Sequence, residues 1–226
     1  YENIQEELQI LKQLPEPVVT WFRANKRKLP WRDHPDAYRV WVSEIMLQQT
    51  RVEAVKSYYQ RFLEALPDVK ALAEAEEDQL LKLWEGLGYY NRVRNMQKAA
   101  TQIMVDYGGE FPQTYEEILS LTGIGSYTAG AISSFAFGLA KPAVDGNVLR
   151  VISRITGSDR DIMKQSVRKR METLLEQVIP ADASSDFNQG LIEMGAIVCV
   201  PNGEPKCQDC PAKEFCVAHK KGIETE

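Results

Sequence analysis

The chain reads Leu121-Thr122-Gly123-Ile124-Gly125-Ser126-Tyr127-Thr128-Ala129 between two stretches that we expect to be helical. Gly123 and Gly125 allow a tight turn whose backbone N–H groups can approach a phosphate, and the N-terminus of the following helix adds a favourable dipole. This pattern is typical of a helix-hairpin-helix at about residues 115–137. Its alternative is an ordinary turn in which Ile124 only fills the core, but the capped helix before the turn and the small residues after it favour phosphate binding.

Apolar residues recur at helical spacing on both sides of this turn, without the alternation of a half-buried strand, so we expect an all-α protein. Pro15 and Pro17 break the first segment, and Thr114 with Glu117 forms a capping box before the turn. The expected helices cover approximately residues 38–49, 52–66, 78–84, 90–107, 114–121, 127–137, 147–156, 165–178 and 185–197.

The length and composition indicate an ordinary globular chain. Its 226 residues suffice for one large domain or two small lobes, and 44% of them are hydrophobic. The sequence shows neither the ~20-residue apolar run of a membrane span nor a signal peptide, so we expect a cytoplasmic location without membrane contact. The formal charge of −5 argues mildly against nucleic-acid binding, but clustered basic residues leave it open.

All four cysteines lie near the C-terminal end, in the pattern Cys199-x7-Cys207-x2-Cys210-x5-Cys216. They cannot brace the rest of the chain, which excludes the disulfide framework of a small secreted protein. Four thiolates suit either a 4Fe-4S cluster or a tetrahedral zinc ion, and the spacing alone does not decide between them.

The helix-hairpin-helix, an aspartate some twenty residues after it (Asp145) and the four terminal cysteines together resemble the endonuclease III and MutY superfamily of base-excision glycosylases. The resemblance covers about residues 21–216. It implies a six-helix lobe at about 30–136, a second lobe from 1–29 plus 137–226, and a 4Fe-4S cluster on the cysteines. The first cysteine gap departs from the family's usual six residues by one, so we expect that loop to bulge.

Within the superfamily, residues 42–50 (Val-Ser-Glu-Ile-Met-Leu-Gln-Gln-Thr) resemble the MutY branch, which removes adenine. Glu44 shares a helical face with Val40, Trp41 and Leu47, where a carboxyl group is costly unless it is paired or functional. The alternative is a glutamate that reaches the surface. A buried carboxyl group is more easily kept protonated, as a general acid requires, and the resemblance implies that Glu44 protonates adenine at N7.

Asp145 precedes Gly146 and Asn147, and its residue type and position are fully explained by an N-cap that opens the next helix. The resemblance adds that Asp145 stays ionised and stabilises the cationic sugar left when adenine departs, and that Asn147 orders the same site. Tyr127 stands where lyase-competent relatives carry a nucleophilic lysine, so we expect a glycosylase without strong strand cleavage. Its alternative role is an aromatic packed under the hairpin.

Other positions match family residues that read the extruded base or enter the base stack. Trp31 and Tyr89 would otherwise pass as core aromatics. The residues matched to the adenine pocket are Arg27, Trp31, Arg32, Leu47, Val52 and Gln189, and those matched to DNA contacts are Gln49, Thr50, Tyr89, Gly123 and Gly125.

The resemblance implies a monomer that acts on double-stranded DNA containing A:8-oxoguanine or A:G mispairs. It also implies a further C-terminal domain, not present in residues 1–226, that reads 8-oxoguanine. Two other readings remain open, an endonuclease III-like lyase for oxidised pyrimidines and a DNA-damage-binding module without catalysis. Glu44 and Tyr127 count against the first, and Glu44 with Asp145 against the second.

Overall fold

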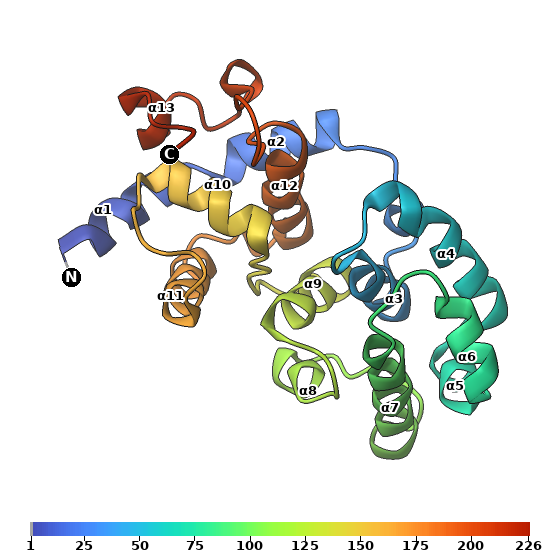
Figure 1. Ribbon diagram of the computed structural model, residues 1–226. Helices are drawn as coiled ribbons and strands as arrows, with labels where there is room; N and C mark the ends of the chain where they lie inside the picture. The colour runs from blue at the N-terminus through green and yellow to red at the C-terminus, as the bar shows by residue number, and fades with distance from the viewer. Residues whose placement is uncertain (1) are drawn as a thin grey trace. The chain divides into compact units, whose positions relative to one another are not determined.

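A computed structural model describes residues 2–226, with side chains from Ile4 onward. All regular structure in this range is helical, which confirms the all-α prediction. The chain forms two separate units: a terminal unit, made of the residues up to Arg27 together with Gly138–Glu226, and a central unit, Lys28–Phe137 (Figure 1). No helix in the described range is long and apolar enough to cross a membrane.

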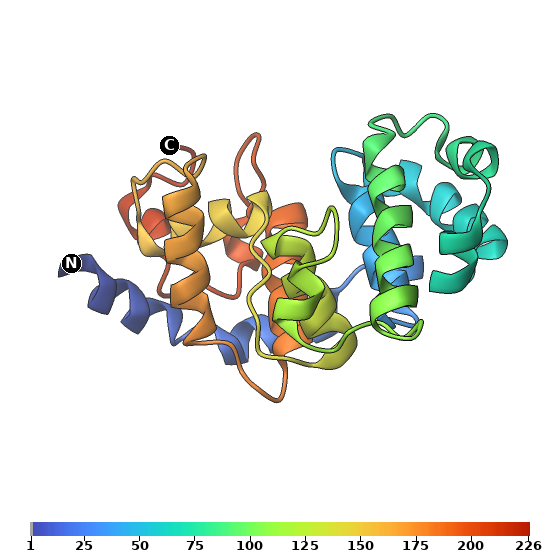
Figure 2. The ribbon, with the colours of Figure 1, turned by 90° about the horizontal axis from the view of Figure 1, so that it is seen from below.

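The central unit begins with a short 3-10 turn and continues through seven helices. The turn is η1 (Pro30–Arg32), and the helices are α3 (Ala37–Leu47), α4 (Val52–Ala65), α5 (Val69–Glu74), α6 (Glu77–Trp84), α7 (Asn91–Asp106), α8 (Tyr115–Leu119) and α9 (Ser126–Phe137). The almost entirely buried α3 packs against α9 and α4, and α7 runs beside α5 and α6 (Figure 2). The burial of α3 on nearly all sides makes any polar side chain within it significant.

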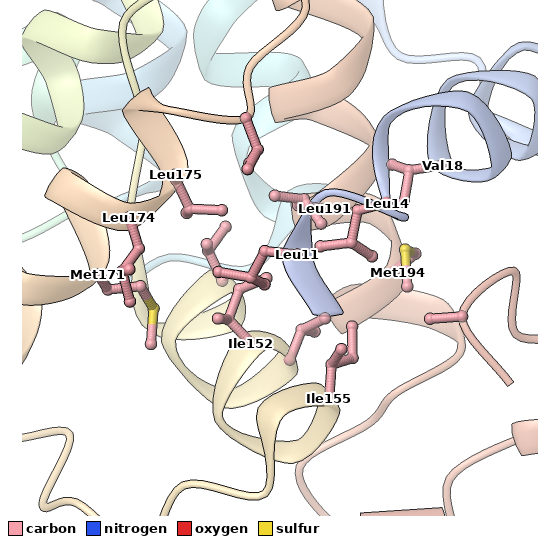
Figure 3. Packing of buried hydrophobic residues seen from close by; sticks show 14 of the residues in the cluster. Leu11, Leu14, Val18, Ile152, Ile155, Met171, Leu174, Leu175, Leu191 and Met194 are labelled. Carbon is pink, nitrogen blue, oxygen red and sulfur yellow. The ribbon is translucent and has the colours of Figure 1, made fainter. Parts of the chain in front are cut away.

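The terminal unit joins the two ends of the chain. Its helices are α1 (Glu2–Leu11), α2 (Pro15–Asn25), α10 (Gly146–Thr156), α11 (Gln165–Glu176), α12 (Ser184–Ile197) and α13 (Val217–Lys221), with a 3-10 turn η2 (Cys207–Asp209). Leu11, Leu14, Leu191 and Met194 meet side chains of α10 and α11 in one apolar core (Figure 3). Helix α10 is strongly amphipathic, which is why its Val148, Ile152 and Ile155 are all buried.

The helix starts follow from local chemistry. The hydroxyl of Thr114 accepts a hydrogen bond from the N–H of Glu117, as the capping box predicts, and the carboxylate of Glu117 accepts from the hydroxyl of Thr114 rather than from its backbone N–H. Pro15 starts α2 rather than merely breaking the first segment, because a proline in the first turn forfeits no helical hydrogen bond. Helix α5 was not predicted; Asp68 caps it by accepting from the N–H of Ala71 at 2.8 Å.

Two glycines in α12 let other parts of the terminal unit approach its backbone. A Cβ on Gly190 would lie 2.7 Å from Cγ1 of Val18 in α2, and one on Gly195 would lie 2.7 Å from Cβ of Asn147 in α10. Both distances are shorter than real Cβ contacts, so the neighbouring side chains leave room only for glycine at these positions. Helix α12 therefore packs closely on α2 and α10.

Candidate active site

The helix-hairpin-helix turn lies between α8 and α9 as predicted. Gly123 has a φ of 79°, and a Cβ on it would lie 2.9 Å from Cβ of Asn95, so both its backbone and its surroundings require glycine. Gly125 is exposed and faces open space, while Ile124 is buried. The turn thus fills the core with Ile124 and still leaves the backbone at Gly125 accessible.

Glu44 lies in the middle of α3 and is buried, with 8% of its surface exposed, so the alternative of a glutamate reaching the surface is wrong. The phenolic hydroxyl of Tyr127, at the start of α9, donates a hydrogen bond of 2.7 Å to Oε2 of Glu44. The packing of α3 against α9 brings these two residues together. Tyr127 therefore fixes the position of the Glu44 carboxyl group at one of its two oxygens.

Asp145 is the N-cap of α10, as the sequence predicts. Its Oδ1 accepts from the N–H of Val148 at 2.9 Å, and its Oδ2 accepts from the side-chain amide of Asn147 at 3.2 Å. Burial raises the pKa of Asp145 above its usual value, while these hydrogen bonds and the nearby charge of Arg150 oppose that rise. A cation placed beside the carboxylate would also act against this rise in pKa.

Arg150 orients Asn147, a role that the sequence analysis did not assign. Its Nη2 donates to Oδ1 of Asn147 at 3.0 Å and to the carbonyl of Gly195 at 2.6 Å, and its Nε donates to the carbonyl of Cys199 at 3.1 Å. The amide of Asn147 is therefore fixed with its oxygen toward Arg150 and its nitrogen toward Asp145. A continuous hydrogen-bonded chain runs from Asp145 to the first cysteine.

Two of the residues matched to the adenine pocket lie in the terminal unit. The backbone N–H, Nε and Nη2 of Arg27 all donate to the carboxylate of Glu193, at 2.8, 3.1 and 2.7 Å. Glu193 is completely buried in α12, where an unpaired charge would be costly, and Arg27 balances its charge. The side-chain amide of Gln189 donates to the hydroxyl of Ser185 at 2.9 Å.

The other matched pocket residues lie in the central unit. Trp31 is buried and packs edge-on against Tyr59, with the ring centroids 5.6 Å apart. It therefore has the core contact expected of an ordinary aromatic. Arg32, Leu47 and Val52 are partly exposed.

The residues matched to the base stack lie on two turns of the central unit. Helix α3 ends at Leu47, earlier than predicted, because Gln49 adopts a left-handed backbone with a φ of 60°. Tyr89 has a φ of 47° and is 68% exposed, so it is not a core aromatic. Gln49 is also exposed, and Thr50 is partly exposed. Both turns thus present a polar or aromatic side chain to solvent.

Cys199, Cys207, Cys210 and Cys216 line a single pocket in the terminal unit. Arg154 reaches this pocket from α10 and donates from Nη1 to Sγ of Cys199 at 3.3 Å. Among the described residues, one set of three possible metal ligands has its ligand atoms within 4.8 Å of one another, and it consists of Cys207, His219 and Glu224. No three of the thiols form such a set. The thiols therefore line one pocket without being gathered around a single tetrahedral ion.

The structure assembles the predicted residues in two groups. Glu44 and Tyr127 meet within the central unit, and Asp145 and Asn147 meet within the terminal unit. Sequence reasoning missed Arg150, which orients Asn147, and Glu193, which holds Arg27. A signal for Glu193 was present, because it is an acidic residue beside Leu191 and Met194 in an apolar helix.

Comparison with known families identifies this arrangement. The family model of the HhH-GPD superfamily base excision DNA repair protein matches residues 42–177, a stretch that begins just before Glu44 and includes the hairpin and Asp145. The chain belongs to the HhH-GPD superfamily. The expected superfamily is thereby confirmed.

This HhH-GPD chain is similar to curated adenine DNA glycosylases. It is 40% identical over 202 residues to that of Buchnera aphidicola subsp. Acyrthosiphon pisum, covering 89% of this chain and 57% of the relative. It is 41% identical over 213 residues to that of Homo sapiens, covering 90% of this chain and 39% of the relative. The HhH-GPD chain thus spans about half the length of these curated relatives.

A solved structure of a thermostable thymine-DNA glycosylase has the same fold as this HhH-GPD chain. The TM-score is 0.84 at 28% sequence identity, with 96% of this chain and 98% of that chain covered. The similarity extends over both units of the chain, so each unit has a counterpart in a protein of known structure.

Proposed function

We propose that this chain is an adenine DNA glycosylase, which extrudes adenine from an A:8-oxoguanine or A:G mispair in duplex DNA and hydrolyses its N-glycosidic bond. The observation that carries the proposal is the buried Glu44 with Tyr127 donating to its Oε2 at 2.7 Å. A buried carboxyl group that is held in place by a hydrogen bond from a tyrosine is suited to general acid catalysis. The names of the curated relatives support adenine as the base.

Glu44 supplies the proton that makes adenine a leaving group. The proton on the carboxyl oxygen not bound to Tyr127 moves to N7 of adenine, and the bond between C1′ and N9 breaks with its electron pair going to the base. Adenine leaves as a neutral molecule, and the sugar keeps the positive charge. Tyr127 holds the carboxyl group at one oxygen throughout this step.

Asp145 stabilises the positive charge that remains on the sugar. Its carboxylate is oriented by Val148 and Asn147, so no reorganisation is required when the cation forms. Water then adds to C1′ and returns a proton to the carboxylate of Glu44. The products are free adenine and an abasic site, and the enzyme is regenerated.

The reaction should end at the abasic site. A phenol at position 127 cannot form a Schiff base with the sugar, which is the step that leads to strand cleavage. The proposal therefore includes a monofunctional glycosylase, for which borohydride treatment traps little covalent adduct. The exposed backbone at Gly125 supports a phosphate contact that holds the duplex in place.

Each unit contains residues that we propose contact the extruded adenine. An extruded base is read by stacking and by hydrogen bonds along its edge. Arg27, held by Glu193, keeps a fixed guanidinium, and Gln189 offers an amide. The residues of the central unit that we propose contact the base are Trp31, Arg32, Leu47 and Val52.

The four cysteines would hold a 4Fe-4S cluster. In a tetrahedral zinc site with Zn–S bonds of ~2.3 Å the sulfurs lie only ~3.8 Å apart. No three thiols of the described chain come within 4.8 Å of one another, although all four line one pocket, so they fit a larger group better than one ion. Glycosidic hydrolysis moves no electrons, so a cluster held by the four cysteines would have a structural role in ordering the loop around them.

A single-turnover assay on defined duplexes tests the proposed activity. With enzyme in excess, we expect adenine release from A:8-oxoguanine and A:G duplexes and none from thymine-glycol or T:G duplexes. Release of thymine or an oxidised pyrimidine instead would overturn the adenine assignment, and binding without any release would favour the DNA-binding module. Metal analysis of the same preparation should find iron; stoichiometric zinc without iron would overturn the cluster.

A further inference from the structure

Two turns of the central unit have an unfavourable backbone. Gln49 and Tyr89 are the non-glycine residues with a positive φ in the described part of the chain, at 60° and 47°. Such conformations cost free energy for residues with a Cβ and persist only when their surroundings impose them. The turns lie about forty positions apart in sequence, one after α3 and one before α7.

Arg92, at the start of α7, is hydrogen-bonded to both turns. Its Nη1 donates to the carbonyls of Ile45 and Gln48, at 2.8 and 2.6 Å, and its Nη2 donates to the carbonyls of Leu87 and Gly88, at 3.2 and 3.3 Å. The first pair belongs to the end of α3, where carbonyls lack helical partners and a cation is favoured. A single guanidinium thus joins the turn of Gln49 to the turn of Tyr89.

The surroundings of Arg92 show that these four contacts set its position. Its guanidinium carbon lies 5.2 Å from the ring centroid of Trp84 and 5.8 Å from that of Tyr89. Trp84 is fully buried and donates from Nε1 to the carbonyl of Gly88, so it gives the guanidinium a rigid surface to pack on. The Nε of Arg92 is buried without a hydrogen-bond partner, a cost that the other contacts must offset.

The other hydrogen bonds of the turn that follows α3 are long, at 3.3–3.5 Å, and come from within the turn itself. A cavity of about 200 Å³ lies beside it, lined by Gln48 and Arg92 together with Trp41, Asn95 and Thr122. The carbonyl of Gln48 also accepts a long hydrogen bond of 3.5 Å from the hydroxyl of Thr50 in the same turn, so its short hydrogen bond is the one of 2.6 Å from Arg92. Loss of the guanidinium would free the turn to relax toward an unstrained backbone.

We propose that Arg92 is a positioning residue that fixes the turns of Gln49 and Tyr89 in one arrangement, so that both side chains enter the base stack together when adenine is extruded. This inference rests on the proposed function. It assigns Arg92 to the opening of the duplex. The positive charge of Arg92 alone would instead suggest phosphate binding. The planar fork of arginine is essential here, because one ammonium group cannot reach four carbonyls in two turns.

The test uses the whole chain and a duplex in which 2-aminopurine replaces the target adenine opposite 8-oxoguanine. The fluorescence of 2-aminopurine rises when the base unstacks. We expect Arg92→Met and Arg92→Lys to slow this rise by roughly ten- to a hundredfold, and to slow excision from the natural mispair equally. The matched control is Arg94→Met, because Arg94 lies in the same helix and pairs only loosely with Glu77, at 3.6 Å; it should behave as the parent protein.

Salt dependence distinguishes this positioning role from phosphate binding, and thermal unfolding distinguishes it from a general role in folding. If Arg92 binds a phosphate, lysine will restore function, and the dependence of log K on log salt will lose about one unit of slope in Arg92→Met; that result overturns the proposal. Normal unstacking in folded Arg92→Met or Arg92→Lys also overturns it. If Arg92→Met fails to fold, the folded Arg92→Lys decides alone. The parent protein reports separately on the proposed function, since it must unstack the base whatever Arg92 does.

Discussion

Glu44 lies in the middle of a helix, and a tyrosine side chain donates to its carboxyl group. Asp145 lies at the start of a helix, and a backbone N–H of that helix donates to its carboxylate, together with the amide of Asn147. Asp145 stabilises α10 as its N-cap, so its presence has a structural reason that is independent of chemistry. Glu44 has no such reason, because a buried carboxyl group within an apolar helix costs stability. Substitutions at the two positions should therefore affect stability and catalysis in different proportions.

The largest effect is expected for Glu44→Gln. The amide preserves the shape of the side chain and can still accept the hydrogen bond from Tyr127, but it cannot donate the acid proton. Single-turnover excision should fall by ~10²–10⁴-fold, with duplex binding within a few fold and no loss of thermal stability. A rate close to that of the parent protein would remove Glu44 from the mechanism and leave Asp145 as the only catalytic carboxylate.

A somewhat smaller effect is expected for Asp145→Asn. Asparagine caps helices about as well as aspartate, so stability should change little while excision falls by ~10²–10³-fold. The matched control is Asp68→Asn, which changes the N-cap of α5 in the same way and should leave excision unaffected. An equal loss of excision in both variants would mean that the effect is on folding.

The same variant also tests the direction of the pKa shift. Because burial raises the pKa of Asp145, the carboxylate is protonated as the pH falls through a value above the ordinary ~3.9, and excision should be lost there. The pH–rate profile of the parent protein should show this acid limb, and that of Asp145→Asn should lack it. An acid limb that persists in the variant would assign the titration to another group.

The smallest effect is expected for Tyr127→Phe, which removes the donor to Glu44 without adding a charge. Loss of a hydrogen bond worth ~1 kcal/mol predicts roughly fivefold slower excision. Tyr38→Phe is the control, because it removes a buried hydrogen bond to the carbonyl of Leu66 in the same unit. It should lower stability and leave excision unchanged; equal excision rates in the two variants would show that the bond to Glu44 does not matter.

Local patterns predicted the parts of the fold that local chemistry determines. The helices, the capping box at Thr114, the cap at Asp145 and the hairpin glycines all depend on residues within a few positions of one another. Helix α5 was missed because it is a six-residue helix with too few apolar positions to show a period. The burial of Glu44 was predicted because its neighbours on the helix face are apolar.

The partners of the site residues could not be predicted in this way. Arg92 meets carbonyls more than forty positions away, and Arg27 meets Glu193 from the opposite end of the chain. Glu193 carries the same signal as Glu44, an acid in an apolar helix, yet one is paired with an arginine and the other with a tyrosine. The sequence signal marks a buried acid but does not say what will neutralise it.

The close packing around Gly190 and Gly195 limits how this protein can be engineered. Replacing a glycine in a helix by alanine is a common route to thermostability, worth up to ~1 kcal/mol per site. In α12 the added methyl group would collide with Val18 at one position and with Asn147 at the other. A consensus or library design that rewards helix propensity would favour these two substitutions, and the second would displace the amide that orients Asp145. Helix propensity alone would thus place alanine where both the packing of α12 and the orientation of Asp145 oppose it.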